Sequence, residues 1–438
     1  SMREKAEDKR AAAEQKGQTY DPVAALLVKR KTESDEQATA RLNTLLDADP
    51  YLREPRLPDD PESVSARAKT LDVRLQQGDP ELRDLWQRFR ELSIAALEHT
   101  YESLGVDFDH YTGESFFEDK MKPVVDLAAQ QRILTESQGA QVIPMGEDAK
   151  GNERPPAIIL KSDGGTTYLL RDLAAAIYRH EQYGFETNLY VVDTRQSGHF
   201  DQVFAVLRTL GFDWADRCEH VPFGAVRIDG EVMSSRLGNV VLVEEFVRQN
   251  AAAVVEVMRE KNPRLEEEVG PKVFQQTARE VALGAILFEL LKVDRNGDVD
   301  YRSAEALNFD GETGPRVQMV YAKTGSVLRK YRDTFGADPD PSTWRSSDYT
   351  TQTERQLIRL LGEYPERVRK ALAEKQPYVV ARYALEISDA LNLYWRETTF
   401  LDEANPNAAA SRVALLARIR QVIQQALRLL GIATPDRM

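Results

Sequence analysis

The sequence is first informative through what it lacks. It has a single cysteine, Cys218, in 438 residues, which excludes a disulfide within the chain and a zinc cluster built from cysteines. No apolar run approaches the ~20 residues of a membrane span, and the charged opening, residues 1–7, lacks the apolar core of a secretory signal. A Gly-x-x-x-x-Gly-Lys phosphate loop is also missing. We therefore expect a cytoplasmic protein without membrane contact, bound metal or P-loop chemistry.

An excess of positive charge is lacking as well. The chain has 58 Lys and Arg against 71 Asp and Glu, a formal net charge of −13 at pH 7. This balance argues against a surface coated by nucleic acid, because phosphate binding needs cations. Acidic residues crowd the first three hundred positions, whereas the stretch after Glu305 is roughly balanced. Contact with RNA along one edge stays open, as does a helical part that binds nothing.

Helix signals dominate both ends of the chain. The Asp-Pro pairs at 21–22 and 79–80 are typical of helix starts, since a side-chain oxygen caps the helix and proline needs no N–H in the first turn. After the second pair, apolar residues recur at three and four positions up to Gly105, at Leu82, Leu85, Phe89, Leu92 and Ala96. Beyond Val240 the pattern is almost wholly helical. The last helix carries one apolar stripe, formed by Val413, Leu416, Ile419, Ile423, Leu427 and Leu430.

Between these helical parts, strands and helices alternate. Short β-prone runs at 156–170, 187–194 and 220–226 are separated by helical stretches at 171–183 and 200–210. This order predicts parallel βαβ units, whose ligands lie beyond the carboxyl ends of the strands. Asp229-Gly230 then predicts a hairpin turn.

The expected fold class is therefore α/β followed by all-α. We predict a helical platform with a proline-rich connector at 1–78, an α/β domain at 79–300 and a helical domain at 301–438.

The loop 230–239 is the segment best suited to phosphate chemistry. Backbone amides and the hydroxyls of Ser234 and Ser235 can hold phosphate oxygens, and Arg236 can neutralise charge that develops in a phosphoryl or nucleotidyl transfer. A solvated turn with capping serines is the alternative, and the loop alone favours it.

The same loop, Met233-Ser-Ser-Arg-Leu-Gly-Asn239, resembles the KMSKS signature of the class I arginyl-tRNA synthetases. Further matches to this family occur in order along the chain, at 113–115, 161–168, 171–174, 196–200 and 220–224. The resemblance runs from about residue 79 to Met438. It implies an incomplete Rossmann-like class I catalytic domain with a KMSKS-like loop, followed by a helical anticodon-binding bundle.

By this resemblance, an arginine pocket is formed by Glu114, Tyr168, Asp172 and Gln196. The two carboxylates would face the guanidinium and amino groups of the substrate, the ring would pack on it, and the amide would orient it. A planar cation with five donors suits a bidentate carboxylate and a flat wall. Structural roles remain open, with Asp172 as a carboxylate at a helix N-terminus and Tyr168 as a core ring.

The resemblance also implies an ATP side. Met233, Ser234, Ser235 and Arg236 would stabilise the leaving pyrophosphate, with Mg²⁺ entering in the ATP complex and no tightly bound cofactor. His199 and Gly224 are two further candidates, although a lone histidine is more often a structural donor. The implied reaction joins arginine to ATP as arginyl-adenylate and then to tRNA(Arg). It depends on alignment and charge stabilisation more than on a protein acid or base.

For tRNA, the resemblance points to the helical part. Gln318, Tyr321 and Met438 match the family's bundle, and Tyr394 and Trp395 are candidates for stacking on unpaired anticodon bases, with core packing as the alternative. Cations could contact phosphates from one face, namely Arg329, Lys330, Arg332, Arg355, Arg359, Arg367, Arg369 and Lys370. The expected partners of this monomer are tRNA(Arg), L-arginine and ATP.

The chain departs from the family in three respects. No histidine is followed by x-Gly-His, so the HIGH motif is missing, as is the family's N-terminal tRNA-elbow domain. Arg236 is the only cation of the loop, and Arg316 and Met319 stand where many members have tyrosines. Because Ser1-Met2 looks like a cloning remnant, we expect a fragment of a working arginine–tRNA ligase. The alternative is a catalytically degenerate paralogue that binds arginine or tRNA.

Overall fold

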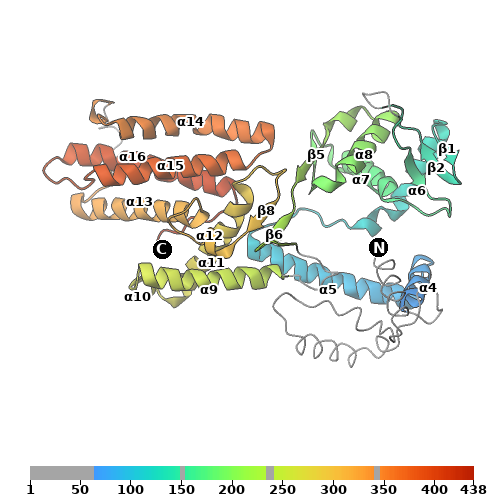
Figure 1. Cartoon of the computed structure of the whole chain (residues 1–438), viewed down its shortest axis with the longest axis horizontal. Helices are drawn as coiled ribbons and strands as arrows, with labels where there is room; N and C mark the ends of the chain where they lie inside the picture. The colour runs from blue at the N-terminus through green and yellow to red at the C-terminus, as the bar shows by residue number, and fades with distance from the viewer. Residues whose placement is uncertain (1–63, 148–152, 233–240, 340–345) are drawn as a thin grey trace, which may run out of the picture. The chain divides into compact units, whose positions relative to one another are not determined.

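The computed structural model describes residues 64–147, 153–232, 241–339 and 346–438. They form two compact units (Figure 1): residues up to Val106 together with the segment that ends at Val243, and Asp107–Val232 together with Glu244–Met438. The predicted helix at Asp21-Pro22, the proline-rich connector and the loop 233–240 lie outside the described residues.

The first unit contains helices α4 (Val64–Gln76) and α5 (Pro80–Leu104). Asp79 caps α5, because its side chain accepts hydrogen bonds from the backbone N–H groups of Glu81 and Leu82, and Gly105 ends the helix in the left-handed conformation. The predicted bounds of this helix are confirmed. Its apolar stripe is not buried within the described residues, since Phe89 is 60% and Leu92 70% exposed.

The α/β part of the second unit has two small sheets. An antiparallel sheet joins β1 (Thr135–Ser137), β2 (Ala140–Ile143) and β3 (Ala157–Leu160), and a parallel pair joins β4 (Asn188–Asp193) and β5 (Cys218–Phe223). The helices of this part are α6 (Glu118–Gln130), α7 (Tyr168–Tyr183) and α8 (Ser197–Thr209). Of the predicted βαβ units, β4–α8–β5 is confirmed. The unit expected from the runs 156–170 and 187–194 is wrong, because β3 pairs antiparallel with β2 in a separate sheet and not with β4. The β1–β2 hairpin was not predicted.

Two helices of this part begin three residues before their predicted starts. Helix α7 begins at Tyr168 because Thr167 caps it, accepting a hydrogen bond from the N–H of Leu170. The same hydroxyl donates to the carbonyl of Ile158 in β3 at 2.9 Å, so the start of α7 is fixed on the sheet. Helix α8 begins at Ser197, directly after a single 3-10 turn, η3 (Thr194–Gln196), which follows β4.

A third sheet contains the first residues of the phosphate-loop candidate. Strand β6 (Val226–Ile228) pairs antiparallel with β7 (Glu231–Val232) through the predicted Asp229-Gly230 turn, and parallel with β8 (Val299–Tyr301). Gly224 precedes β6 and cannot carry a side chain, since a Cβ would lie 2.2 Å from the carbonyl oxygen of Gly297. The segment between β5 and β6 therefore packs directly against the turn before β8.

The remaining elements are helical. They are α9 (Val243–Lys261), α10 (Leu265–Val269), α11 (Pro271–Leu291), α12 (Ser303–Ala306), α13 (Gly314–Phe335), α14 (Gln352–Glu374), α15 (Tyr378–Glu397) and α16 (Pro406–Leu429). Figure 1 shows α13, α14, α15 and α16 packed alongside one another. Their common core contains the whole predicted stripe of the last helix. The predicted order, α/β followed by all-α, is confirmed.

Helices α11 and α13 approach each other at two glycines. A Cβ on Gly314 would lie 2.3 Å from the carbonyl oxygen of Gly284, and a Cβ on Gly284 would lie 2.5 Å from the side-chain oxygen of Gln318. Both positions therefore exclude a side chain. Of the helices that the structure describes, none is long and apolar enough to cross a membrane. The described residues also contain no cluster of three or more metal-ligating side chains.

Candidate functional site

Glu114 and Tyr168 meet at a guanidinium group. Glu114 opens the 3-10 turn η2 (Glu114–Phe117), and its Oε2 lies 2.7 Å from Nη1 of Arg171 on α7. The same guanidinium lies 5.4 Å from the centre of the Tyr168 ring, close enough for a cation–π contact. Tyr168 is 71% exposed, so the alternative of a core ring is wrong. Two of the side chains predicted to bind a substrate guanidinium therefore contact the guanidinium of Arg171 in this structure.

Asp172, in the second turn of α7, pairs with a residue of the neighbouring helix. Its Oδ2 lies 2.6 Å from Nε2 of His199 in the first turn of α8. Because a carboxylate only accepts, Nε2 carries the proton of this hydrogen bond. The alternative of a helix-N-terminal carboxylate is not supported, since Asp172 lies beyond the first turn.

Gln196 lies directly before the first residue of α8. It is exposed, it ends η3, and it precedes His199 by three residues on the chain. Glu114, Tyr168 and Asp172 thus lie around the first two turns of α7, while Gln196 directly precedes the helix that carries His199. The contacts of all four residues with a substrate stay predictions.

The ends of β4 and β5 are fixed by polar contacts. The hydroxyl of Thr194 donates to the carbonyl of Phe223 at 2.8 Å, which ties the end of β4 to the end of β5. Hydrogen bonds from the Arg195 side chain and backbone hold the pKa of Asp193 low, at about 2. These contacts lie at the carboxyl edge of a parallel pair, where ligands bind in folds of this type.

The ATP-side candidates are only partly described. Met233, Ser234, Ser235 and Arg236 lie outside the described residues. Gly224 packs against Gly297, and its N–H donates to the carbonyl of Arg295 at 2.7 Å. This packing explains the glycine, and a role of Gly224 towards ATP stays a prediction.

Arg295 is a residue that sequence reasoning missed. Its Nη1 donates to the carbonyl of Pro222 in β5 at 2.6 Å, and its Nε donates to the carbonyl of Lys375 at 3.0 Å. Its backbone N–H donates to the side chain of Gln376 at 3.2 Å. One side chain thus joins the end of β5 to the turn between α14 and α15. These partners are about 73 to 81 positions away in sequence, so no local signal could reveal them.

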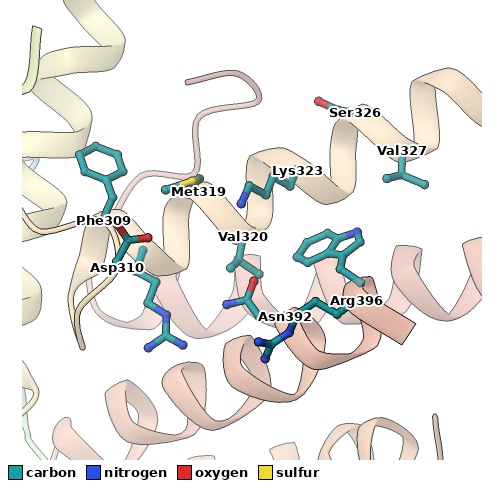
Figure 2. A pocket seen from close by; sticks show the side chains of 11 residues that line it. Phe309, Asp310, Met319, Val320, Lys323, Ser326, Val327, Asn392 and Arg396 are labelled. Atoms are coloured by element: carbon teal, nitrogen blue, oxygen red, sulfur yellow. The ribbon is translucent and has the colours of Figure 1, made fainter. Parts of the chain in front are cut away.

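In the helical part, a hollow of about 590 Å³ lies between α13 and α15. Figure 2 shows Lys323 of α13 and Asn392 of α15 among its lining side chains. Its other lining residues include the half-buried Trp395 and two more cations, Arg316 and Arg396. Arg316 is paired with Asp389, whereas no ion pair joins Lys323 or Arg396 to a carboxylate within the described ranges. A flat ring beside exposed cations suits a stacked base and its phosphate.

Three of the predicted tRNA contacts are wrong because the side chains are buried. Tyr394 is fully buried, and its hydroxyl donates to Oε1 of Glu354 at 3.0 Å, so the core-packing alternative holds for this ring. Gln318 is also fully buried and donates to the carbonyls of Glu280 and Ala433. Tyr321 is buried under Arg420, whose guanidinium lies 3.5 Å from the ring centre. A side chain without exposed surface cannot contact an RNA base.

The other predicted contacts fare differently. Met438 is partly buried and packs on the same apolar cluster as Met319, which lines the hollow. On α14, four of the predicted phosphate-binding cations are paired with glutamates of their own helix, namely Arg359, Arg367, Arg369 and Lys370. This compensation lowers the net positive charge that α14 can offer to phosphates.

Comparison with known proteins gives the family. Residues 17–302 match the model of the class I tRNA synthetase (R) catalytic domain, and residues 317–438 match the DALR anticodon-binding domain. The chain belongs to the class I arginyl-tRNA synthetase family. The catalytic match includes the segment that we separated at residue 78, and the boundaries proposed from the sequence stay predictions.

The relatives agree with this assignment. The chain is 39% identical to an arginine–tRNA ligase of Lactobacillus johnsonii over 365 residues, which are 83% of this chain and 62% of the relative. It is 38% identical to that of Streptococcus pneumoniae over 415 residues, 94% of this chain and 70% of the relative. The chain thus spans about two thirds of the length of these relatives.

Solved structures of the family share the fold. The arginyl-tRNA synthetase of Thermus thermophilus superimposes with a TM-score of 0.73 at 25% identity, covering 98% of this chain and 73% of the other. That of Plasmodium falciparum gives a TM-score of 0.71 at 21% identity, covering 90% and 67%.

Proposed function

We propose that this chain supplies the arginine-, ATP- and tRNA-binding parts of an arginine–tRNA ligase, which attaches arginine to tRNA(Arg) through arginyl-adenylate. The family and the names of its relatives support this reaction. The observation that carries the proposal for this chain is the guanidinium of Arg171 held between Glu114 and Tyr168. The carboxylate and the aromatic ring that contact this guanidinium are the groups that could also bind the guanidinium of free arginine.

In this proposal, the group around α7 selects the substrate by charge and shape. Asp172 and Glu114 bind the guanidinium and amino groups, Tyr168 forms a wall, and Gln196 orients the backbone of the amino acid. Carboxylates suit arginine because two parallel N–H groups can donate to one carboxylate. An uncharged analogue of the same shape would leave the carboxylates without a cation.

On the ATP side, Ser234, Ser235 and Arg236 would hold the pyrophosphate as it leaves, and Mg²⁺ would arrive with ATP as part of the substrate. The loop that carries them follows β7 directly in sequence. The bound arginine carboxylate attacks the α-phosphate in line, so the residues of this chain act by alignment and by neutralising charge.

On the tRNA side, the hollow between α13 and α15 is the candidate contact with an unpaired base. Trp395 supplies the ring for stacking, while Lys323 and Arg396 supply cations for the neighbouring phosphates. Met438 supports this region through the cluster that it shares with Met319. Nothing in the comparisons favours a degenerate paralogue.

Calorimetric titration of the 438-residue protein with L-arginine and with citrulline, its uncharged analogue, tests the arginine site. We expect arginine to bind and citrulline to bind at least about tenfold more weakly, because the carboxylates lose a charge-assisted partner. Asp172→Asn and Glu114→Gln should lose this preference. Glu181→Gln, an exposed residue of the same helix, is the matched control and should keep it. Equal affinity for both ligands would overturn the proposal.

A further inference from the structure

The contact between Asp172 and His199 joins two helices at the predicted arginine site. The atoms are 2.6 Å apart, and the residues are 27 positions apart in sequence. We propose that His199 is a positioning residue for arginine binding: it holds one oxygen of Asp172 so that the other faces the substrate cation. This inference rests on the proposed function, since it requires Asp172 to bind arginine.

The geometry assigns different tasks to the two carboxylate oxygens of Asp172. Oδ2 accepts the hydrogen bond from His199, and the remaining oxygen is left for another donor. A free aspartate rotates about two side-chain bonds, so fixing one oxygen also fixes the direction of the other. Binding then needs less ordering of the protein, and such preorganisation raises affinity.

His199 is itself held in place by a buried neighbour. It lies in the first turn of α8, and its ring meets the edge of Phe200 at a centroid distance of 5.2 Å. Phe200 is buried and stacks on His220 of β5 at 5.0 Å. The imidazole is therefore attached to a packed part of the α/β core, which makes it a firm support for a partly exposed carboxylate.

The charges around Asp172 leave its second oxygen available. The neighbouring Arg171 pairs with Glu114, and the guanidinium of Arg179, further along α7, lies over the ring of Tyr190 at 5.6 Å. Within the described part of the chain, His199 is the residue that forms an ion pair or hydrogen bond with the Asp172 side chain. This arrangement places His199 on the arginine side, whereas the sequence suggested the ATP side.

The test measures arginine affinity by calorimetry, together with the thermal midpoint, for five variants of the same protein. For His199→Ala, we expect arginine affinity to fall by about tenfold, which corresponds to the loss of ~1.4 kcal/mol. For His199→Gln, whose amide can also donate to Asp172, we expect affinity to return to within about threefold of the wild type. If the imidazole had only a structural role, His199→Gln would not restore arginine affinity.

A matched control separates positioning from stability. His180, on the same helix as Asp172, stacks on Trp214 and makes no hydrogen bond with Asp172 among the described residues. His180→Ala should lower the thermal midpoint about as much as His199→Ala and leave arginine affinity unchanged. In the Asp172→Asn background, His199→Ala should add no further loss, because both act through one contact.

The outcomes distinguish this inference from the proposed function. If Asp172→Asn leaves arginine affinity unchanged, or the wild type does not bind arginine, the proposed site is wrong and this inference falls with it. If Asp172→Asn weakens binding while His199→Ala does not, only the positioning role is overturned. Failure of His199→Gln to restore affinity would also overturn it.

Discussion

Arg295 connects the α/β part to the helical part through one side chain, and its removal gives a quantitative prediction. Arg295→Ala removes the hydrogen bonds to the carbonyls of Pro222 and Lys375 and keeps the backbone hydrogen bond to Gln376. A hydrogen bond to a charged group contributes about 1.5–3 kcal/mol. Because the side chain is half-buried and water can replace part of the loss, we expect a total of about 2 kcal/mol for both bonds.

Hydrogen exchange measured peptide by peptide is the suitable assay, since a protein of several parts need not unfold in one step. A loss of about 2 kcal/mol corresponds to roughly 30-fold faster exchange by local opening. We expect this change in the peptides that cover β5 and residues 375–380. Arg295→Lys should lie between wild type and alanine, because lysine can reach one carbonyl but cannot reproduce the fork of a guanidinium.

The control is Arg302→Ala, which removes an exposed side chain that follows β8 and pairs with Asp300 and Glu305. An exposed pair contributes only about 0–1 kcal/mol, so exchange in β5 should change little. Unchanged exchange in Arg295→Ala, or a uniform increase over all helices, would refute the view that Arg295 holds these two segments together.

Four further predictions can each be tested with one assay or one pair of variants. Tyr394→Phe should lower the free energy of unfolding by about 1 kcal/mol in urea denaturation and leave tRNA affinity unchanged. Trp395→Ala should weaken tRNA binding in a filter assay by about 1–3 kcal/mol. The reverse result would contradict our placement of the two rings. Arg171→Gln should strengthen arginine binding up to about fivefold in calorimetry, because it frees Glu114 from an exposed ion pair. Weaker binding would contradict this and show that Arg171 helps to orient Glu114 for the substrate. Burial raises the pKa of the Cys218 thiol, so less thiolate exists at a given pH, and labelling by a disulfide reagent at pH 8 should be slower in the native than in the urea-unfolded protein. The 438 residues contain no His-x-Gly-His, so ATP–pyrophosphate exchange with arginine and tRNA should run orders of magnitude below that of an intact synthetase, and comparable turnover would disprove this.

The sequence predicted those elements that local chemistry decides. Asp79 and Gly105 mark the ends of α5, Asp229-Gly230 makes its hairpin, and the stripe of the last helix is buried, because caps, turns and periods are properties of neighbouring residues. The β1–β2 hairpin was missed, since its strands have only three and four residues and the first is exposed throughout. Strands this short carry no readable alternation.

The sequence indicated which residue types belong to the candidate site, but it did not indicate which of these side chains contact one another. Tyr394 and Trp395 are adjacent in sequence, yet one is buried and the other lines a hollow, because the helices packed around α15 decide which face is covered. The pairing of Glu114 with Arg171 spans 57 positions. A family motif identifies the residues of such a contact, but only the folded structure shows which of them meet and at what distance.

The approach of α11 and α13 at Gly284 and Gly314 restricts which sequences this bundle can explore. Each glycine is closed by the other helix, one by a backbone oxygen and the other by the amide of Gln318, which also binds Ala433. A side chain at Gly314 would therefore force the two helices apart, whereas one at Gly284 would displace the amide of Gln318 from the carbonyl of Ala433. In a saturation library, Gly314 should tolerate no substitution, and a substitution of Gly284 would require a simultaneous change at Gln318, a path that stepwise mutation rarely opens.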